Sequence, residues 1–316
     1  MQSSLRDPVP FRPAAWCRGG HAQTIASSLL GDTSKPPHRR VEIPTPDDDF
    51  LELDLAGEEN EGPCVVLFHG LEGSSDRYYM ASMMRALATE GFAACAVNFR
   101  SCGSRMNRRP RFYHSGETDD YRTVFEWADR HFPGRRLTAV GFSLGANALL
   151  KYLGEEGGET PLYAAAAVSA PYDLKLGSLA LSRGFNRLYE QLFLRTLRQK
   201  LARKREHHPE LPSFEGTTLY GFDHKVTAPV HGFNGAEDYY YTCSARRFLE
   251  DIRTPSLLVH SREDPICPVE ALPMQKILAN PDLDYLLTDS GGHVGFRGKY
   301  GNWLSHTLLR FLAGRL

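Results

Sequence analysis

The sequence of 316 residues predicts an α/β fold, built on one mostly parallel β-sheet with helices on both faces. Short continuous apolar runs, such as "PCVVLFHG" (63–70) and "FAACAVNFR" (92–100), are typical of strands that are buried on both faces of a sheet. These runs alternate with helical segments, which favours parallel strands joined by right-handed crossovers. The length suits one large domain with a substantial core.

The expected elements follow one another regularly along the chain. The segments 38–44 and 49–57 predict an antiparallel hairpin around the turn at 46–49. Further strands are expected at 63–70, 92–100, 136–142, 162–171, 255–261 and 283–293, which gives a sheet of eight strands. Helices are expected at 74–91, 118–134, 146–156 and 302–314.

The strands at 162–171 and 255–261 are separated by about 80 residues, far more than a strand-to-helix connection needs. We therefore expect an insertion at about 171–249, which forms a helical cap over the carboxyl edge of the sheet. Its central helix, at 183–208, carries many basic residues and an apolar stripe that we expect to cover a cleft: Phe185, Leu188, Tyr189, Leu192, Leu197 and Leu201. Weak contact of this helix with a membrane surface is the alternative.

The whole chain, residues 1–316, is expected to form a single domain. Its core would comprise about 38–170 and 250–316, with the N-terminal segment 1–37 packed on it. The net charge of −1 gives no field that attracts nucleic acid. No signal peptide and no transmembrane run of about 18 apolar residues is visible. Six cysteines without a C-x-x-C pair indicate reduced thiols and disfavour zinc, so we expect a cytoplasmic protein.

The stretch "AVGFSLGAN" (139–147) contains a G-x-S-x-G pattern centred on Ser143. A chain with 28 glycines can produce this pattern by chance, so its context decides. Here the serine follows a predicted strand and opens a predicted helix, as a nucleophile on a sharp strand-to-helix turn does. The small Gly141 and Gly145 would let that helix approach the neighbouring strands. Ser143 is therefore the predicted nucleophile.

A serine hydroxyl needs a base, and the base needs an acid that orients it. His293 is the predicted base because it follows a strand in the glycine-flanked loop "SGGHVGF". Asp264 is the predicted acid because it follows the strand at 255–261, in the turn "REDPICP" that its prolines make rigid. Glu263 is the alternative acid. The resulting order along the chain is nucleophile, acid and base, opposite to that of chymotrypsin-like proteases.

Two backbone N–H groups are candidates for an oxyanion hole. One belongs to Leu144, directly after the predicted nucleophile. The other belongs to Leu71 in "FHGLEGSS" (68–75), the loop after the strand at 63–70, where Gly70 and Gly73 permit the turn. Such donors stabilise the charge that appears only in a tetrahedral intermediate.

Together these motifs resemble the α/β-hydrolase superfamily, and more narrowly its YheT-like branch, the AB hydrolase 4 family. The family's pattern maps its nucleophile onto Ser143, its acid onto Asp264 and its base onto His293. At two positions the chain differs from what members of this family often carry: Ala146 and Ser101 both stand where glycine is common. Neither residue touches a predicted catalytic atom. The resemblance covers nearly the whole chain and rests on "GGHAQTI", "FHGLEGSS", "NFRSCGS", "YHSGETDD", "VGFSLGAN", "VSAPYDL", "DYYYTCSA", "EDPICP" and "GGHVGF".

The resemblance implies an α/β-hydrolase fold and the hydrolysis of carboxylic esters (EC 3.1.1.-) through an acyl-enzyme on Ser143. The expected substrates are short- to medium-chain acyl esters or lipids, with no cofactor and no metal. Two alternatives stay open: acyl transfer to an alcohol by the same triad, and a non-catalytic protein that binds a ligand with this fold. The sequence indicates no oligomeric state.

Three motifs have no role in this hypothesis. "YHSGETDD" (113–120) could be a metal site, but Ser, Thr and Asp at a helix start favour capping of the helix. "GGHAQTI" (19–25) is expected to pack on the fold. "DYYYTCSARRFL" (238–249) could form aromatic walls of an acyl pocket or pack the cap.

Overall fold

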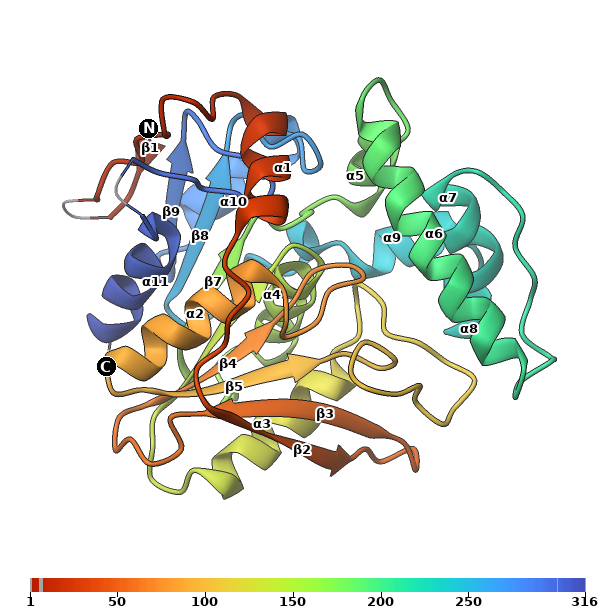
Figure 1. Ribbon diagram of the computed structural model, residues 1–316, viewed down its shortest axis with the longest axis horizontal. Coiled ribbons are helices and arrows are strands. Elements are labelled where there is room, and N and C mark those ends of the chain that lie inside the picture. Colours follow the sequence, from red (N-terminus) through yellow and green to blue (C-terminus); the bar gives the residue numbers. More distant parts are fainter. Residues whose placement is uncertain (1, 6–7, 300, 316) are drawn as a thin grey trace.

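The computed structural model describes residues 2–5, 8–299 and 301–315 (Figure 1). Its sheet has nine strands in the order β1-β9-β8-β7-β6-β4-β5-β3-β2. The bounds are β1 Gln2–Ser3, β2 His38–Pro44, β3 Phe50–Ala56, β4 Cys64–Phe68, β5 Ala93–Asn98, β6 Leu137–Phe142, β7 Leu162–Val168, β8 Ser256–Ser261 and β9 Leu283–Thr288.

The mostly parallel α/β sheet is confirmed, and all eight predicted strands are present. Strands β4 to β9 pair in parallel, whereas β2, β3 and β5 pair antiparallel. The ninth strand is β1, which pairs antiparallel with β9. Two residues are too few to show an alternating pattern, so this strand was not predicted. Residues 1, 6 and 7 of the predicted N-terminal segment lie outside the described residues.

Helices cover both faces of the sheet, because successive side chains of a strand point to opposite faces. Val66 of β4 packs in one hydrophobic cluster with residues of α3 (Asp119–His131), α4 (Leu144–Glu156) and α10 (Met274–Ala279). Its neighbour Val65 packs in the other cluster, with α2 (Tyr78–Thr89) and α11 (Trp303–Ala313). This arrangement explains why the central strands are apolar without interruption.

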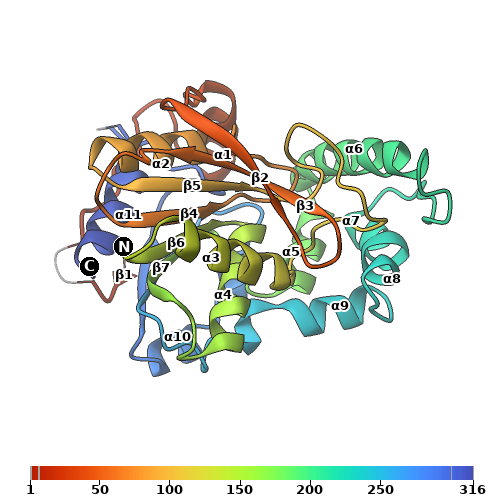
Figure 2. The ribbon, with the colours of Figure 1, turned by 90° about the horizontal axis from the view of Figure 1, so that it is seen from below.

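The segment between β7 and β8 is helical. It contains α5 (Leu174–Leu181), α6 (Asn186–Arg205), α7 (Leu219–Phe222), the π-helical turn η1 (Asp223–Thr227), α8 (Ala228–Val230), α9 (Ala236–Cys243) and the 3₁₀ turn η2 (Ala245–Arg247). Figures 1 and 2 show the helices α5 to α9 grouped at one end of the sheet. No helix in the described part of the chain is long and apolar enough to cross a membrane.

The predicted apolar stripe on α6 is correct for only half of its residues, among them Leu197, which lines the cavity beside Ser143. Phe185, Leu188 and Leu192 are about half exposed, whereas Tyr189 and Leu201 are buried as predicted. The buried face of α6 also includes Leu194, together with two polar residues, Glu190 and Lys204. Apolar residues lie almost all around the first half of α6, so the pattern alone did not show which of them face the protein.

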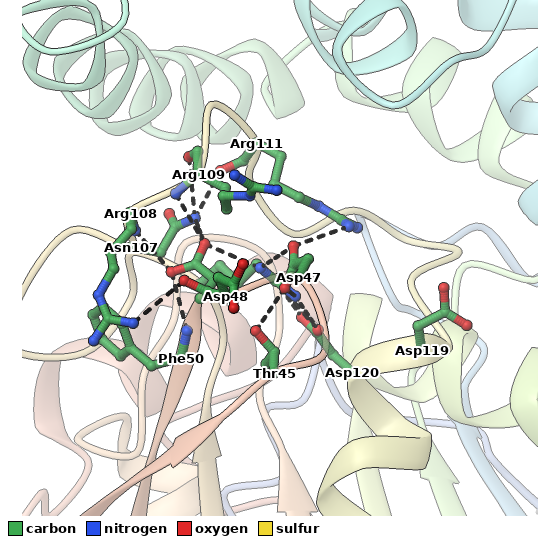
Figure 3. A network of polar contacts seen from close by, with 12 residues as sticks. Thr45, Asp47, Asp48, Phe50, Asn107, Arg108, Arg109, Arg111, Asp119 and Asp120 are labelled. Carbon is green, nitrogen blue, oxygen red and sulfur yellow. Dashed lines mark hydrogen bonds and ion pairs between the residues drawn. The ribbon is translucent and has the colours of Figure 1, made fainter.

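A buried charge network joins the turn between β2 and β3 to the start of α3 (Figure 3). The Arg100 guanidinium, whose side chain is 2% exposed, lies 2.9 Å from Asp47, 3.0 Å from Asp49 and 2.7 Å from Asp120. Asn107 donates a hydrogen bond of 2.6 Å to Asp49. Lys204 of α6 donates to two oxygens of Asn107, each at 2.6 Å, so the network also connects to the inserted helices.

Candidate active site

Ser143 occupies a sharp turn between β6 and α4. Its backbone has φ 54° and ψ −120°, a conformation with positive φ that residues other than glycine rarely adopt. The Ser143 N–H donates to the Val168 carbonyl oxygen at the end of the neighbouring strand β7. Backbone strain of this kind is typical of functional turns. The turn projects the Ser143 side chain into a cavity at the edge of the sheet.

Glycine is required at both positions that flank this turn. A Cβ atom on Gly141 would lie 2.6 Å from Ala146 Cα, and one on Gly145 would lie 2.5 Å from the His69 carbonyl oxygen. Neither contact is compatible with a side chain, because each neighbouring atom is backbone. The two glycines therefore let α4 begin directly against β4 and β6.

Ser143, His293 and Asp264 come together although they lie far apart in the sequence. The distance from His293 Nε2 to Ser143 Oγ is 2.7 Å. On the other side of the ring, His293 Nδ1 lies 3.0 Å from Asp264 Oδ2 and 3.2 Å from Oδ1. With the proton on Nδ1, the ring donates to Asp264 and accepts from the serine hydroxyl. Glu263, the alternative acid, is exposed.

The Asp264 carboxylate is buried but well supplied with hydrogen bonds. Its Oδ1 accepts from the N–H groups of Ile266 and Cys267, each at 2.9 Å. Burial by itself would raise the pKa of Asp264, but the neighbouring His293 and the hydrogen bonds outweigh burial and lower it. The carboxylate is thus held ionised, and it can stabilise a positive charge on the ring of His293.

The two predicted oxyanion donors lie beside Ser143. Leu144 begins α4, and a Cβ atom on Gly70, the residue before Leu71, would lie 3.0 Å from Ser143 Cβ. In the described part of the protein, no acceptor takes a hydrogen bond from the N–H of Leu71 or of Leu144. Both residues line the same cavity as Ser143, so both N–H groups are available to a ligand there.

The loop that carries Leu71 is fixed by residues that the sequence did not indicate. Glu72 has a positive φ of 53°. Its N–H donates to the Tyr113 hydroxyl at 2.6 Å, and its Oε1 accepts from the same hydroxyl at 2.8 Å. Lys200 of α6 lies 2.6 Å from that carboxylate oxygen. An inserted helix thus holds the loop in place.

The "GGHAQTI" motif begins the helix α1 (Gly20–Leu30), which packs against the loop of His293. The His293 N–H donates to Thr24 Oγ1 at 2.8 Å, and Gln23 Oε1 accepts from the Arg297 N–H at 2.6 Å. A Cβ atom on Gly20 would lie 1.7 Å from the Glu263 carbonyl oxygen, which shows how closely α1 approaches the loop of the acid. The helix α1 thus supports the loops of His293 and Asp264. The sequence did not indicate this support, because it depends on contacts between opposite ends of the chain.

A cavity opens next to Ser143 and His293 and holds about 980 Å³ of empty space, including a part that is open to solvent. Its walls come mainly from the loops after β4, β5, β6, β7 and β8 and from the inserted helices. The apolar lining includes Leu174, Leu181, Phe193, Leu197, Phe222 and Ile266. Such a cavity suits a chain of methylene groups.

One set of side chains among the described residues lies close enough together to be considered as a metal site. Ligand-type atoms of Asp264, Cys267 and His293 lie within 4.8 Å of one another. A thiol binds metal as a thiolate. Burial, followed by the charge of Asp264, raises the pKa of Cys267 well above its usual value. These surroundings oppose loss of the thiol proton, so the arrangement fits a hydrogen-bonded pair of Asp264 and His293 better than a metal site.

The "YHSGETDD" stretch leads into α3, but the predicted capping hydrogen bond from its N-cap side chain is not formed. Thr118 is the N-cap residue, but its side chain makes no capping hydrogen bond. Instead, Thr118 Oγ1 donates to Glu155 at 2.7 Å, and Asp120 pairs with Arg100. The stretch therefore joins α3 to α4 and to the buried network.

The fold, the sharp turn at Ser143 and the geometry of the side chains around it define the class of protein. The chain belongs to the α/β-hydrolase fold family, whose model matches residues 63–299. The predicted resemblance to the YheT-like branch is confirmed by 37% identity with the YheT protein of Escherichia coli over 309 residues, 94% of this chain and 88% of that protein.

Two further comparisons agree. The chain is 33% identical to the monoacylglycerol lipase of Saccharomyces cerevisiae over 292 residues, which are 87% of this chain and 63% of that protein. Among solved structures, the Pf2001 esterase of Pyrococcus furiosus superposes with a TM-score of 0.62 at 17% identity, covering 98% of this chain and 99% of that one. The structural comparison supports the shared fold.

Proposed function

We propose that this protein hydrolyses carboxylic esters through an acyl-enzyme on Ser143. The observation that carries the proposal is the continuous series of hydrogen bonds from Ser143 through His293 to Asp264. The family membership and the monoacylglycerol lipase among its relatives support an ester substrate. The apolar cavity supports short- to medium-chain acyl groups or lipids.

In the first half of the reaction, Ser143 Oγ attacks the ester carbonyl carbon while His293 Nε2 takes the hydroxyl proton. Negative charge moves to the carbonyl oxygen, where the N–H groups of Leu71 and Leu144 stabilise it. Asp264 stabilises the charged His293 ring. The ring then gives its proton to the alcohol oxygen as the carbon–oxygen bond breaks, and the alcohol leaves.

In the second half, water replaces the alcohol. His293 takes a proton from the water as the water oxygen attacks the acyl carbon, and the same two N–H groups stabilise the second tetrahedral intermediate. Its collapse returns the proton to Ser143 and releases the carboxylic acid. His293 thus receives a proton first from Ser143 and then from water, and passes it on to the alcohol and then to Ser143, so no cofactor is required.

A fluorophosphonate probe tests the nucleophile. We expect it to label the wild-type protein and not Ser143→Ala, which should also lose at least about 10⁴-fold in kcat for acyl esters. The matched control is Ser28→Ala, an exposed serine of α1, which should behave as wild type. Labelling that survives in Ser143→Ala would contradict the assignment.

The same assay separates the alternatives. Acyl esters of increasing chain length are supplied with and without an alcohol acceptor, and the released acid and the new ester are measured. Net hydrolysis supports the proposal, whereas synthesis that outruns hydrolysis would favour acyl transfer. A folded wild type that is neither labelled nor active would favour a non-catalytic ligand-binding protein.

We also infer that the chain forms one domain, in which the insertion at about 171–249 caps the cavity on a core of about 38–170 and 250–316. Residues of the insertion that line the cavity support this assignment. A cytoplasmic location is inferred from six cysteines that are all free thiols, five of them buried.

A weak contact of the insertion with anionic membranes is proposed from the outer side of α6. Phe185, Leu188 and Leu192 are about half exposed there, and the exposed Arg187 and Arg195 lie on the same helix. Sedimentation with phosphatidylserine vesicles should carry more wild-type protein than a Leu188→Asp variant. Equal sedimentation of the two would contradict the contact.

A further inference from the structure

The part of the cavity wall that the insertion contributes holds a carboxylate, Asp223. This residue begins the π-helical turn η1 and lines the same cavity as Ser143 and His293. Single π-helical turns are rare and occur frequently at functional sites. The reaction proposed above uses no group at this position, so the carboxylate needs a separate explanation.

Hydroxyl groups surround Asp223. Thr227 Oγ1 donates to Asp223 Oδ1 at 2.7 Å, and the Tyr240 hydroxyl donates to Oδ2 at 2.8 Å. The Tyr240 hydroxyl also lies 3.1 Å from Ser178 Oγ. Ser178, Thr227 and Tyr240 all line the cavity. One carboxylate and three hydroxyls thus form a polar cluster in a mostly apolar wall.

The charge of Asp223 has no cationic partner among the described residues. Burial raises the pKa of Asp223 to about 6, against the opposing effect of the hydrogen bonds from Thr227 and Tyr240. A carboxylate can accept about four hydrogen bonds, and this one accepts two from the described residues. Asp223 is only partly buried and lines the cavity, so its remaining acceptor capacity faces a ligand there.

Other polar groups of the same cavity wall already form hydrogen bonds with backbone groups of the protein. The Tyr239 hydroxyl accepts from the Ser115 N–H at 2.8 Å. His231 contacts the Thr227 carbonyl oxygen at 2.7 Å and the Phe112 carbonyl oxygen at 3.1 Å. Asp223 and Ser178 are therefore the groups best placed to bind a polar part of a ligand.

We propose that Asp223, Tyr240 and Ser178 form a polar subsite that binds a hydroxyl group of the substrate, remote from the ester bond. The substrate hydroxyl donates to Asp223 and accepts from Ser178, so both of its hydrogen-bonding roles are met. A quaternary ammonium group fits less well, because it has no N–H to donate to Asp223 and no lone pair to accept from Ser178, so it would use only the charge of the site. The inference rests on the proposed function and narrows its substrate class to hydroxylated acyl esters.

The hydroxyl can belong to the acyl chain or to the alcohol portion, and matched esters distinguish the two. One series has 4-nitrophenyl esters of linear acids with and without a terminal hydroxyl; the other has acyl esters of linear diols and of the corresponding mono-alcohols. The readout is the ratio of kcat/KM for the hydroxylated ester to that for its unhydroxylated partner. This ratio is measured within each variant, so it does not depend on the folded fraction.

In one of the two series, we expect a wild-type ratio of one or more at the chain length that reaches Asp223. Asp223→Leu should lower that ratio by about 10- to 100-fold, because the substrate hydroxyl then faces an apolar side chain and loses its hydrogen-bond acceptor. Asp223→Asn keeps an acceptor oxygen and should retain most of the ratio. The matched control is Asp251→Leu at an exposed aspartate, which should leave the ratio at its wild-type value.

Two results would overturn the subsite while leaving the proposed function intact. One is a ratio that Asp223→Leu leaves at its wild-type value at every chain length in both series, with active, fluorophosphonate-labelled protein. The other is a trimethylammonium analogue that outperforms the hydroxylated ester and loses this advantage in Asp223→Asn. A wild type that hydrolyses no ester and takes no label would overturn both the subsite and the proposed function.

Discussion

Lys200 lies 2.6 Å from Glu72, and this contact joins an inserted helix to the loop that carries the proposed oxyanion donor Leu71. Glu72 has a backbone conformation of positive φ, and its side chain also accepts a hydrogen bond from the Tyr113 hydroxyl. The position of the Leu71 N–H thus depends on how α6 packs on the core.

Replacement of Lys200 by Met should therefore slow the chemical step. We expect kcat to fall by about 10-fold with little change in KM, because the donor acts on charge that develops in the transition state. Lys200→Arg should restore most of kcat, and Lys200→Met should add little to Glu72→Gln in a double variant. A change confined to KM would contradict a positioning role for Lys200.

Thr24 is expected to position the base. Thr24→Val removes the acceptor of the His293 N–H and should lower kcat by about 10-fold, the effect of one hydrogen bond of roughly 1.4 kcal/mol. Thr24→Ser keeps the hydroxyl and should stay close to wild type. Steady-state kinetics on one acyl ester measures both variants, and equal kcat values for Val and Ser would disprove the role.

Gly145 should tolerate no side chain. A Cβ atom there would lie 2.5 Å from the His69 carbonyl oxygen, so Gly145→Ala must displace the start of α4. We expect a loss of about 1–3 kcal/mol in the free energy of unfolding, together with a loss of activity. Gly158→Ala is the control, since no atom lies within 4 Å of its Cβ position. Urea denaturation compares the two variants.

Arg100→Met should be among the most destabilising single substitutions in this protein. It would leave the carboxylates of Asp47, Asp49 and Asp120 without their shared cation, at a cost of about 3–5 kcal/mol. Arg39→Met removes an exposed ion pair with Glu58 and should cost at most about 1 kcal/mol. Similar midpoints of urea denaturation for both variants would contradict the importance of the network.

Acid should destabilise the protein partly through His69. This ring is buried next to the loop of Leu71, and burial lowers its pKa to about 3, against the opposing hydrogen bond to Gly70. Below about pH 6.5 the unfolded chain binds a proton that the folded chain does not, so stability falls as the pH falls from 6.5 towards 3.

The measurement compares wild type with His69→Asn in urea at about pH 7.5 and pH 5. Between these values the wild type should lose about 1–2 kcal/mol more than the variant, because one proton contributes at most about 1.4 kcal/mol per pH unit. The variant is expected to be the less stable protein at the higher pH. A difference between the two proteins that is the same at both pH values would assign the acid sensitivity to other groups.

Much of the fold could be predicted from the sequence because its signals are local. The apolar runs at 63–70 and 92–100 became β4 and β5, and the long gap between β7 and β8 became helices. The register of α6 could not be predicted, since Leu188 and Leu194 are equally apolar and only contacts with the core decide which one is buried. β1 was missed because it is too short to carry a pattern.

The sequence by itself determined the candidate residues Ser143, Asp264 and His293, because each follows a predicted strand and parallel strands end at the same edge of a sheet. Only the tertiary structure decided what supports them. Thr24 reaches the loop of His293 from the other end of the chain, and Lys200 reaches Glu72 from the insertion. Contacts of this kind depend on how distant segments pack, which local periodicity does not encode.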